Sequence, residues 1–280
     1  MKDLSVVMAT YNENPVFLKA CVISILNQTF ENFEFIVAVE PMEKNMEFLS
    51  GVEDADKRVK ILRNETKLGV AGSRNRAIRE SSGQYIALMD SDDYCAPDRF
   101  EKQLSFLENN PDVSVVGSNM YLLDDSGKVT GERKYPEMHN EIKKSFLLTM
   151  AVANPSVMFR KKDIDEAGLF DDRLYKSEDF ELWLRFLAYN KKMHNLQENL
   201  IYYRMPALHN EKRGHIHWRN NYTARKRYSR LIWPFHIRFL SLLLFFFVSR
   251  LPDTLLDYLT NLKIVERIKH IKPEPGYREP

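Results

Sequence analysis

Short apolar runs alternate with polar turns through the first hundred residues, and this pattern predicts strands that alternate with helices. Four runs have the length and β-forming composition of buried strands: Leu4–Thr10, Phe33–Val39, 59–62 and 83–89. Asn14 and Pro15 are typical of a helix N-cap and first helical position, and they predict a helix that runs to about Leu26. A second helix carries Arg74 and Arg76 and precedes the fourth strand.

Strands that alternate with helices imply right-handed crossovers, so we expect a mostly parallel, Rossmann-like sheet with helices on both faces. Ligands bind beyond the carboxyl ends of the strands in such a sheet. Several polar residues fall at or near that edge: Thr10, Tyr11, Glu13, Glu40, Arg74, Asp90, Ser91 and Asp92. The pattern therefore predicts a ligand site where these residues converge.

The fourth strand ends in Asp90-Ser91-Asp92-Asp93, which places three carboxylates within four residues. Mg²⁺ and Mn²⁺ prefer carboxylate oxygens and share their remaining positions with substrate phosphates, so this cluster is a candidate metal site. The alternative is a polar loop before a helix, with Asp93 near the helix start and Pro97 in its first turn.

Six motifs occur in order along the chain: residues 5–13 (SVVMATYNE), 24–37 (SILNQTF and FEFIV), 69–78 (GVAGSRNRAI), 90–93 (DSDD), 154–160 (NPSVMFR) and 177–185 (SEDFELWLR). In this order they resemble the family 2 glycosyltransferases, the inverting enzymes with the GT-A fold. The resemblance covers about residues 3–205. It implies transfer of a hexosyl or N-acetylhexosaminyl group from a nucleotide-diphosphate sugar, expected to be a UDP-sugar.

The resemblance also implies roles for individual residues. Asp92, with Asp90, is expected to hold Mn²⁺ or Mg²⁺ on the donor diphosphate, and Arg74 to add a planar cation there. The remaining donor-binding residues are Thr10, Tyr11, Glu13, Glu40 and Ser91. Asp179 is the expected general base, with Glu178 and Trp183 on the acceptor side. The alternatives are a surface arginine at position 74 and an acidic pair that stabilises a helix N-terminus at 178–179.

Four residues depart from the family pattern. Val39 and Glu40 stand where two adjacent aspartates are usual, although Glu40 can still accept from a base N–H. Asn154 and Met205 replace common histidines. These departures motivate a second hypothesis, a catalytically silent scaffold subunit that binds nucleotide sugars.

The C-terminal part of the chain is basic and contains an apolar run. The whole chain of 280 residues carries a formal charge of +2, but residues 212–252 hold nine Lys and Arg and no acidic residue. Within this stretch, residues 239–248 (FLSLLLFFFV) make an apolar run too short to cross a bilayer as a helix. With flanking Arg225 and Arg250, and Trp218 and Trp233 as interface anchors, it predicts a monotopic segment on an anionic membrane.

The alternative for this run is a helix that packs on the catalytic core, and the adjoining apolar residues argue against a nucleic-acid partner. We therefore expect a GT-A catalytic domain over 1–210, with a nucleotide half over about 1–95 and an acceptor half over about 96–210. A basic and apolar helical membrane-associating region is expected over 211–270, and a flexible tail over 271–280.

Two smaller sets of residues are expected to have no metal or disulfide role. His209, His215 and His217 are expected in a flexible acceptor-side loop rather than a zinc site, and Cys21 and Cys95 as free thiols. The chain enters its first strand without a secretory signal.

We therefore expect an enzyme peripheral or monotopic at the cytoplasmic face of a bacterial inner (plasma) membrane. Its expected acceptor is a lipid-linked saccharide for a surface polysaccharide such as O-antigen or capsule. A soluble or protein acceptor is the alternative.

Overall fold

The computed structural model describes residues 3–205, 215–260 and 271–273, which form a layered α/β structure around one sheet. The sheet has ten strands, in the order β10-β7-β6-β8-β4-β1-β2-β3, with β9 paired to β6 and β5 paired to β9. The strands are β1 (Leu4–Thr10), β2 (Phe33–Val39), β3 (Val59–Arg63), β4 (Tyr85–Asp90), β5 (Tyr94–Cys95), β6 (Val113–Leu123), β7 (Val129–Arg133), β8 (Met158–Arg160), β9 (Lys192–Arg204) and β10 (Ile271–Pro273).

The sheet is mixed, so the expectation of a mostly parallel sheet holds only for its first part. Strands β1 to β4 are parallel neighbours, as the alternating pattern predicted. Beyond them, β8 runs antiparallel to both β4 and β6, and β7 runs antiparallel to β6. The turn between β6 and β7 spans only residues 124–128. A connection this short can make a hairpin but not the crossover that a parallel neighbour requires.

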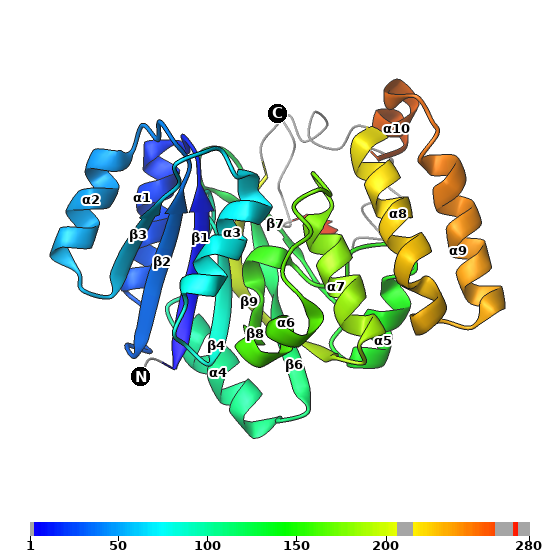
Figure 1. Ribbon diagram of the computed structural model, residues 1–280, viewed down its shortest axis with the longest axis horizontal. Coiled ribbons are helices and arrows are strands. Elements are labelled where there is room, and N and C mark those ends of the chain that lie inside the picture. The colour runs from blue at the N-terminus through cyan, green and yellow to red at the C-terminus, as the bar shows by residue number, and fades with distance from the viewer. Residues whose placement is uncertain (1–2, 206–214, 261–270, 274–280) are drawn as a thin grey trace.

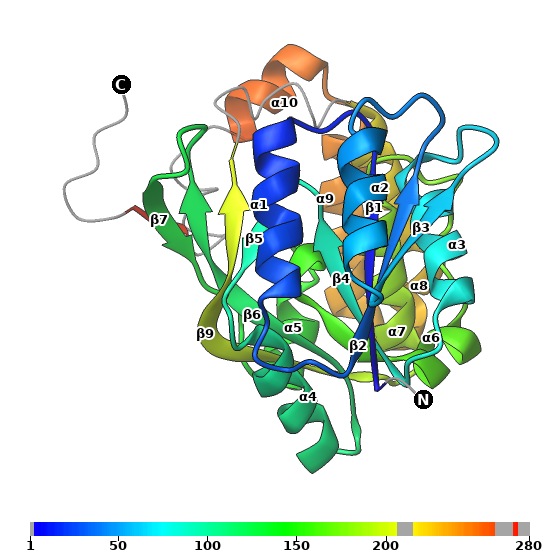
Figure 2. The same ribbon diagram turned by 90° about the vertical axis from the view of Figure 1, so that its left-hand side faces the viewer.

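Helices cover both faces of the sheet, and each face has its own apolar core (Figures 1 and 2). The helices are α1 (Pro15–Leu26), α2 (Met46–Ala55), α3 (Gly69–Glu80), α4 (Arg99–Asn109), α5 (His139–Ser145), α6 (Lys161–Ala167), α7 (Glu178–Ala188), α8 (His215–Ile232), α9 (Phe235–Val248), α10 (Asp253–Thr260) and the short 3₁₀ turn η1 (Asn154–Ser156). Helices α1, α2 and α4 pack on one face, and α3, α5, α6, α7 and α8 on the other.

Helix α1 begins as its sequence predicted, with the Asn14 side chain accepting from the Val16 N–H at 2.9 Å. The polar-loop alternative for Asp93 and Pro97 is wrong in its placement, because α4 begins only at Arg99. Asp93 is instead fully buried and accepts a hydrogen bond from the backbone N–H of Arg204 at 2.8 Å. It therefore anchors the acidic loop to β9.

Residues 215–260 of the C-terminal region are largely helical; α8 packs on α7 and α9 packs on α8 at one end of the molecule (Figure 1). None of the described helices has the length and apolar character needed to cross a membrane. Residues 271–273 form β10 against β7, so this part of the expected flexible tail is an edge strand. The backbone groups of an unpaired edge strand favour such pairing. Residues 274–280 of the expected tail lie outside the described residues.

Three expectations for side chains near α8 need correction. His215 and His217 belong to α8 rather than to a loop, while His209 lies outside the described residues. Arg225 is 1% exposed, and its guanidinium lies over the rings of Phe180 and Phe245. Trp233 is also buried in the core. Neither Arg225 nor Trp233 is therefore available to a lipid surface.

Candidate active site

The carboxyl ends of β1, β2 and β4 bring the predicted donor-binding residues to one edge of the sheet. β1 lies between the other two strands, with Thr10 opposite Val39 and Ala9 opposite Asp90. Glu40 follows Val39 directly, and the loop after β1 begins at Tyr11. The parallel register thus places Thr10, Glu40 and Asp90 at the same level, as the strand pattern predicted.

Arg74, on α3, lies between acidic residues from two other elements, β4 and α7. Its guanidinium, 7% exposed, forms an ion pair with Asp90 at the end of β4. A second nitrogen lies 3.9 Å from a carboxylate oxygen of Glu178, the first residue of α7. The Nε–H has no hydrogen-bond partner among the described residues. Arg74 is therefore a buried cation that joins the donor strand to α7, and not the ordinary surface arginine of the alternative interpretation.

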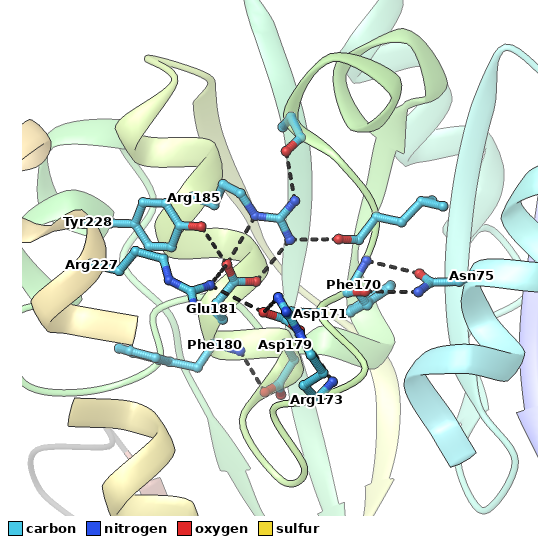
Figure 3. A network of polar contacts seen from close by, with 12 residues as sticks. Asn75, Phe170, Asp171, Arg173, Asp179, Phe180, Glu181, Arg185, Arg227 and Tyr228 are labelled. Carbon is cyan, nitrogen blue, oxygen red and sulfur yellow. Dashed lines mark hydrogen bonds and ion pairs between the residues drawn. The ribbon is translucent and has the colours of Figure 1, made fainter. Parts of the chain in front are cut away.

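Asp179 occupies the second position of α7 (Figure 3), within reach of the charges of Glu178, Arg74 and Asp90. Its pKa is raised to about 7, mainly by burial and then by the negative charges of Glu178 and Asp90. The Phe180 N–H, which donates to Asp179 at 2.6 Å, and the Arg74 charge oppose this rise. A carboxyl group with a pKa near neutrality can both accept and release a proton at physiological pH, which suits a general base.

The loop after β1 joins the acidic loop through side-chain contacts. The Ser91 hydroxyl donates to Glu13 at 3.4 Å. The Tyr11 ring is 48% exposed, with the Lys67 ammonium 5.0 Å from its centre. The Thr10 hydroxyl is buried and has no hydrogen-bond partner within the described residues. This edge therefore offers an exposed aromatic face next to polar and cationic groups.

Glu40 has a structural role that its sequence position did not reveal. The carboxylate is buried and accepts from the Leu68 N–H at 3.0 Å and from the Ser73 hydroxyl at 2.7 Å. These bonds fasten the end of β2 to the start of α3, on which Arg74 lies. Much of its accepting capacity is used within the protein, which reduces what remains for a nucleobase.

The acidic loop has the donor set of a divalent-ion site that substrate phosphates complete. Asp92 is half-buried and Asp90 lies two residues before it. Burial and the charges of Asp92 and Asp90 hold the pKa of Asp93 well above its usual range. Among the residues that the structure describes, no group of three or more His, Cys, Asp or Glu is arranged to hold a metal ion. One or two carboxylates with phosphate oxygens and water are a common Mg²⁺ arrangement, and Asp92 with Asp90 fits it.

The structure places Trp183, expected on the acceptor side, in the apolar core. Its side chain is fully buried and packs edge-on against Phe159 and Phe186. An acceptor could not contact a side chain that has no exposed surface. Trp183 therefore packs α7 onto the core and does not belong to the acceptor site. Glu178 keeps 15% of its side chain exposed at the site.

Sequence reasoning missed a second polar network on α7 (Figure 3). Buried Glu181 forms an ion pair with Arg185 at 2.9 Å and accepts from the Tyr228 hydroxyl of α8 at 2.7 Å. Arg227 of α8 lies 3.6 Å from Glu181 and 3.2 Å from Asp171. The i,i+4 spacing of Glu181 and Arg185 was a readable signal, but the contribution of α8, more than 40 residues later, was not.

A model of the glycosyl transferase family 2 matches residues 5–168, which span this edge of the sheet. The chain is a family 2 glycosyltransferase. It is 33% identical over 276 residues to an uncharacterized glycosyltransferase, MJ1057, of Methanocaldococcus jannaschii, with 93% of each chain covered. It is 29% identical to the Escherichia coli enzyme WfgD, described as a UDP-Glc:alpha-D-GlcNAc-diphosphoundecaprenol beta-1,3-glucosyltransferase, over 67% of this chain and 70% of that one.

The fold of this glycosyltransferase is similar to that of S. aureus TarS in a crystal structure with UDP-GlcNAc. The TM-score is 0.65 at 18% identity, over 95% of this chain and 77% of the TarS chain. This likeness shows that the two proteins share the GT-A fold. The family membership rests on the sequence, because similarity at this level of identity carries the fold alone.

Proposed function

We propose that this glycosyltransferase moves a hexose or N-acetylhexosamine from a UDP-sugar to a hydroxyl of a lipid-linked saccharide, with inversion at the anomeric carbon. One observation carries the proposal: Asp90, Arg74, Glu178 and Asp179 meet at the carboxyl edge of the sheet. The set combines what the reaction requires, a cation for a diphosphate and a carboxylate that can accept a proton. The complex of TarS with UDP-GlcNAc supports the choice of a uridine donor.

The leaving diphosphate is the first requirement of the reaction. Asp92, with Asp90, would hold Mn²⁺ or Mg²⁺, which supplies charge neutralisation to the diphosphate when bound. Arg74 would add its planar N–H donors on the same side, which suits phosphate oxygens. Tyr11 and Glu13 would line the nucleotide, and Ser91 would hold Glu13 in place.

Deprotonation of the acceptor is the second requirement. The acceptor hydroxyl would attack C1 of the sugar on the face opposite the diphosphate, and its proton would pass to Asp179. The new bond joins the acceptor oxygen to C1, while the bond from C1 to the diphosphate oxygen breaks and UDP leaves. A single displacement of this kind inverts the configuration at C1.

The exposed face of α9 supports the proposal of a membrane-bound acceptor. It presents large apolar side chains to solvent: Phe235, Phe239, Leu240, Leu243, Leu244 and Phe247. Arg219, Lys226 and Arg230 of α8 are exposed beside it. An apolar face with neighbouring cations suits an anionic bilayer, so we place the protein at the cytoplasmic face of the plasma membrane. The name of WfgD, which describes an undecaprenol-linked acceptor, supports the same view.

We assign catalysis and membrane contact to separate parts of the chain, with the limits expected from the sequence. Residues 1–210 would carry the chemistry, with the donor in the half before residue 95 and the acceptor in the half after it. Residues 211–270 would contact the membrane. The products would extend a surface polysaccharide such as O-antigen or capsule.

The test is nucleotide release from UDP-glucose, UDP-GlcNAc, GDP-mannose and dTDP-glucose, with Mn²⁺ or with EDTA, and with undecaprenyl-diphosphate-GlcNAc as acceptor. We expect turnover of a UDP-sugar that Asp92→Asn abolishes and that exposed Asp125→Asn, in the β6–β7 turn, leaves unchanged. Metal-independent turnover would contradict the proposed role of Asp92. Donor binding without turnover on any acceptor would favour the silent scaffold subunit, which the buried, fully engaged Glu40 motivates.

A further inference from the structure

The segment that leads into the candidate base consists of turns. Residues 171–177 lie between α6 and α7 and form neither a helix nor a strand, with turn hydrogen bonds from the Leu174 N–H to the Asp171 carbonyl and from the Ser177 N–H to the Leu174 carbonyl. Lys176 has a φ of +64°, in the left-handed region that a non-glycine residue rarely adopts. Ser177 occupies the N-cap position of α7 but makes no capping hydrogen bond with its side chain. The conformation just before Glu178 and Asp179 is therefore sensitive to contacts from other elements as well.

Those contacts come from one face of α8. The Nδ1 atom of His217 lies 2.6 Å from the Lys176 carbonyl oxygen. Because a carbonyl oxygen only accepts, Nδ1 carries the proton and donates it. The Ser177 hydroxyl donates to the His217 carbonyl at 3.0 Å instead of capping α7. The Asn220 amide donates to the Tyr175 carbonyl at 2.8 Å. Three consecutive residues before the catalytic pair are thus bonded to α8.

The same helix also holds the chain on either side of these residues. Arg227 forms an ion pair with Asp171, at the start of the segment, at 3.2 Å. Tyr228 bonds to Glu181, one turn after the start of α7. Residues 217, 220, 227 and 228 lie on one side of an α-helix, given a rotation of about 100° per residue. Figure 3 shows the Arg227 and Tyr228 side chains pointing to α7.

We propose that α8 is part of the catalytic apparatus, and that His217 is a positioning residue that holds Asp179 through its bond to Lys176. This inference rests on the proposed function, in which Asp179 is the base. The contacts assign to the C-terminal helical region a role in catalysis besides membrane contact. The basic side chains exposed on α8 belong to the same helix, so the membrane surface and the base are linked by a single rigid element.

The physical reason is that a base acts only from a narrow range of positions. A displacement of about 1 Å can reduce the rate by about 10². Without the His217 bond, the strained Lys176 backbone would relax, and the start of α7 would move with it. Asp179, which is half-buried, would become more exposed to water, and its neighbouring charges are Glu178, Arg74 and Asp90. Donor binding should change little, because the hydrogen bonds of His217 described above go to Lys176 and Ser177 in the segment before α7.

The test compares His217→Ala with His217→Asn. An asparagine amide can occupy the place of Nδ1 and donate to the Lys176 carbonyl, whereas alanine cannot. We measure kcat and KM with the UDP-sugar that the wild type turns over, the pH profile of kcat, and the affinity for UDP. Thr223→Ala, on the exposed face of the same helix, is the matched control.

We expect His217→Ala to lower kcat about tenfold or more with UDP affinity within about twofold of wild type, and His217→Asn to restore most of the rate. The midpoint of the acidic limb of the pH profile, where kcat rises as Asp179 loses its proton, should fall in the alanine variant, because Asp179 becomes more exposed to water. Should His217→Ala fail to fold, Asn220→Ala provides the same comparison, because it removes one bond from a partly exposed side chain.

Two results would overturn the inference. One is equal activity of the alanine and asparagine variants. The other is a rate loss that follows only the folded fraction, with an unchanged pH profile. Failure of the proposed function gives a different result, because wild type would be inactive or Asp179→Asn would remain active.

Discussion

Replacing Asp179 by asparagine should remove activity and stabilise the protein at the same time. The pKa of Asp179 is about 7, against an ordinary value of 3.8. A difference of about three pKa units, at about 1.36 kcal/mol each, means that the ionised carboxylate costs the folded protein on the order of 4 kcal/mol at pH 8. Asparagine keeps the shape and can still accept from the Phe180 N–H, but it carries no charge.

The gain in stability of the Asp179→Asn variant over wild type should increase with pH. The folded protein binds the Asp179 proton more tightly than the unfolded chain does, so this residue lowers the free energy of unfolding as pH rises from about 4 to 7. Above pH 7 its contribution stays constant. The variant should therefore be more stable than wild type by about 4 kcal/mol at pH 8, by less than about 2 kcal/mol at pH 5, and hardly at all below pH 4.

Urea unfolding of both proteins at pH 5 and pH 8 measures this difference, and kcat is measured on the same samples. We expect kcat to fall by about 10² to 10⁴. Asp172→Asn, an exposed substitution in the segment before α7, is the control and should change neither quantity. A stability gain that is the same at both pH values would refute the raised pKa of Asp179. Retained transfer activity would refute the assignment of the base.

Further predictions concern the donor site and the C-terminal helices. Arg74→Gln should weaken UDP binding by about tenfold in calorimetry, and an unchanged affinity would remove Arg74 from the diphosphate site. Catalysis should follow the ionisation of Asp179, so kcat should rise with pH to a plateau above about pH 7. Leu240→Glu with Phe247→Glu should abolish flotation with phosphatidylglycerol vesicles but leave turnover of a water-soluble acceptor intact; flotation that persists would exclude this face. Arg225→Ala should lower the free energy of unfolding by about 2–4 kcal/mol, because it leaves the Phe146 carbonyl without its side-chain donor and the Leu147 carbonyl with only the Ser241 hydroxyl, whereas exposed Arg230→Ala should change it little.

Local patterns were sufficient for the donor half. Strands β1 to β4, the α1 cap at Asn14 and the placement of Asp90 at a strand end all follow from apolar runs and turn residues that lie next to each other in the chain. These features depend on interactions within a few residues, which is the range over which periodicity and capping act. The directions of β8 and β9 could not be predicted from local patterns, because each direction depends on the distant strand with which that strand pairs.

Charge patterns in the C-terminal region were a weaker guide. The nine basic residues of 212–252 suggested one surface, but Arg225 is buried between two aromatic rings and Arg227 is paired with Asp171. A sequence does not distinguish an exposed cation from one that packs inside. Whether a basic residue of α8 is exposed or buried depends on the elements that pack on α8, which are α7, α9 and the end of α5.

The sequence by itself determined which chemical groups the site contains and which strand ends present them. It named Asp90 from its position at a strand end, and it named Arg74 and Asp179 through the resemblance of the ordered motifs to the family. Tertiary structure alone decided that Arg74 joins Asp90 to Glu178, that Asp179 has a pKa near 7, and that α8 holds the segment before the base. The reason is physical: burial, ion pairing and pKa depend on distances between residues that lie from sixteen to more than a hundred positions apart, and only folding sets those distances.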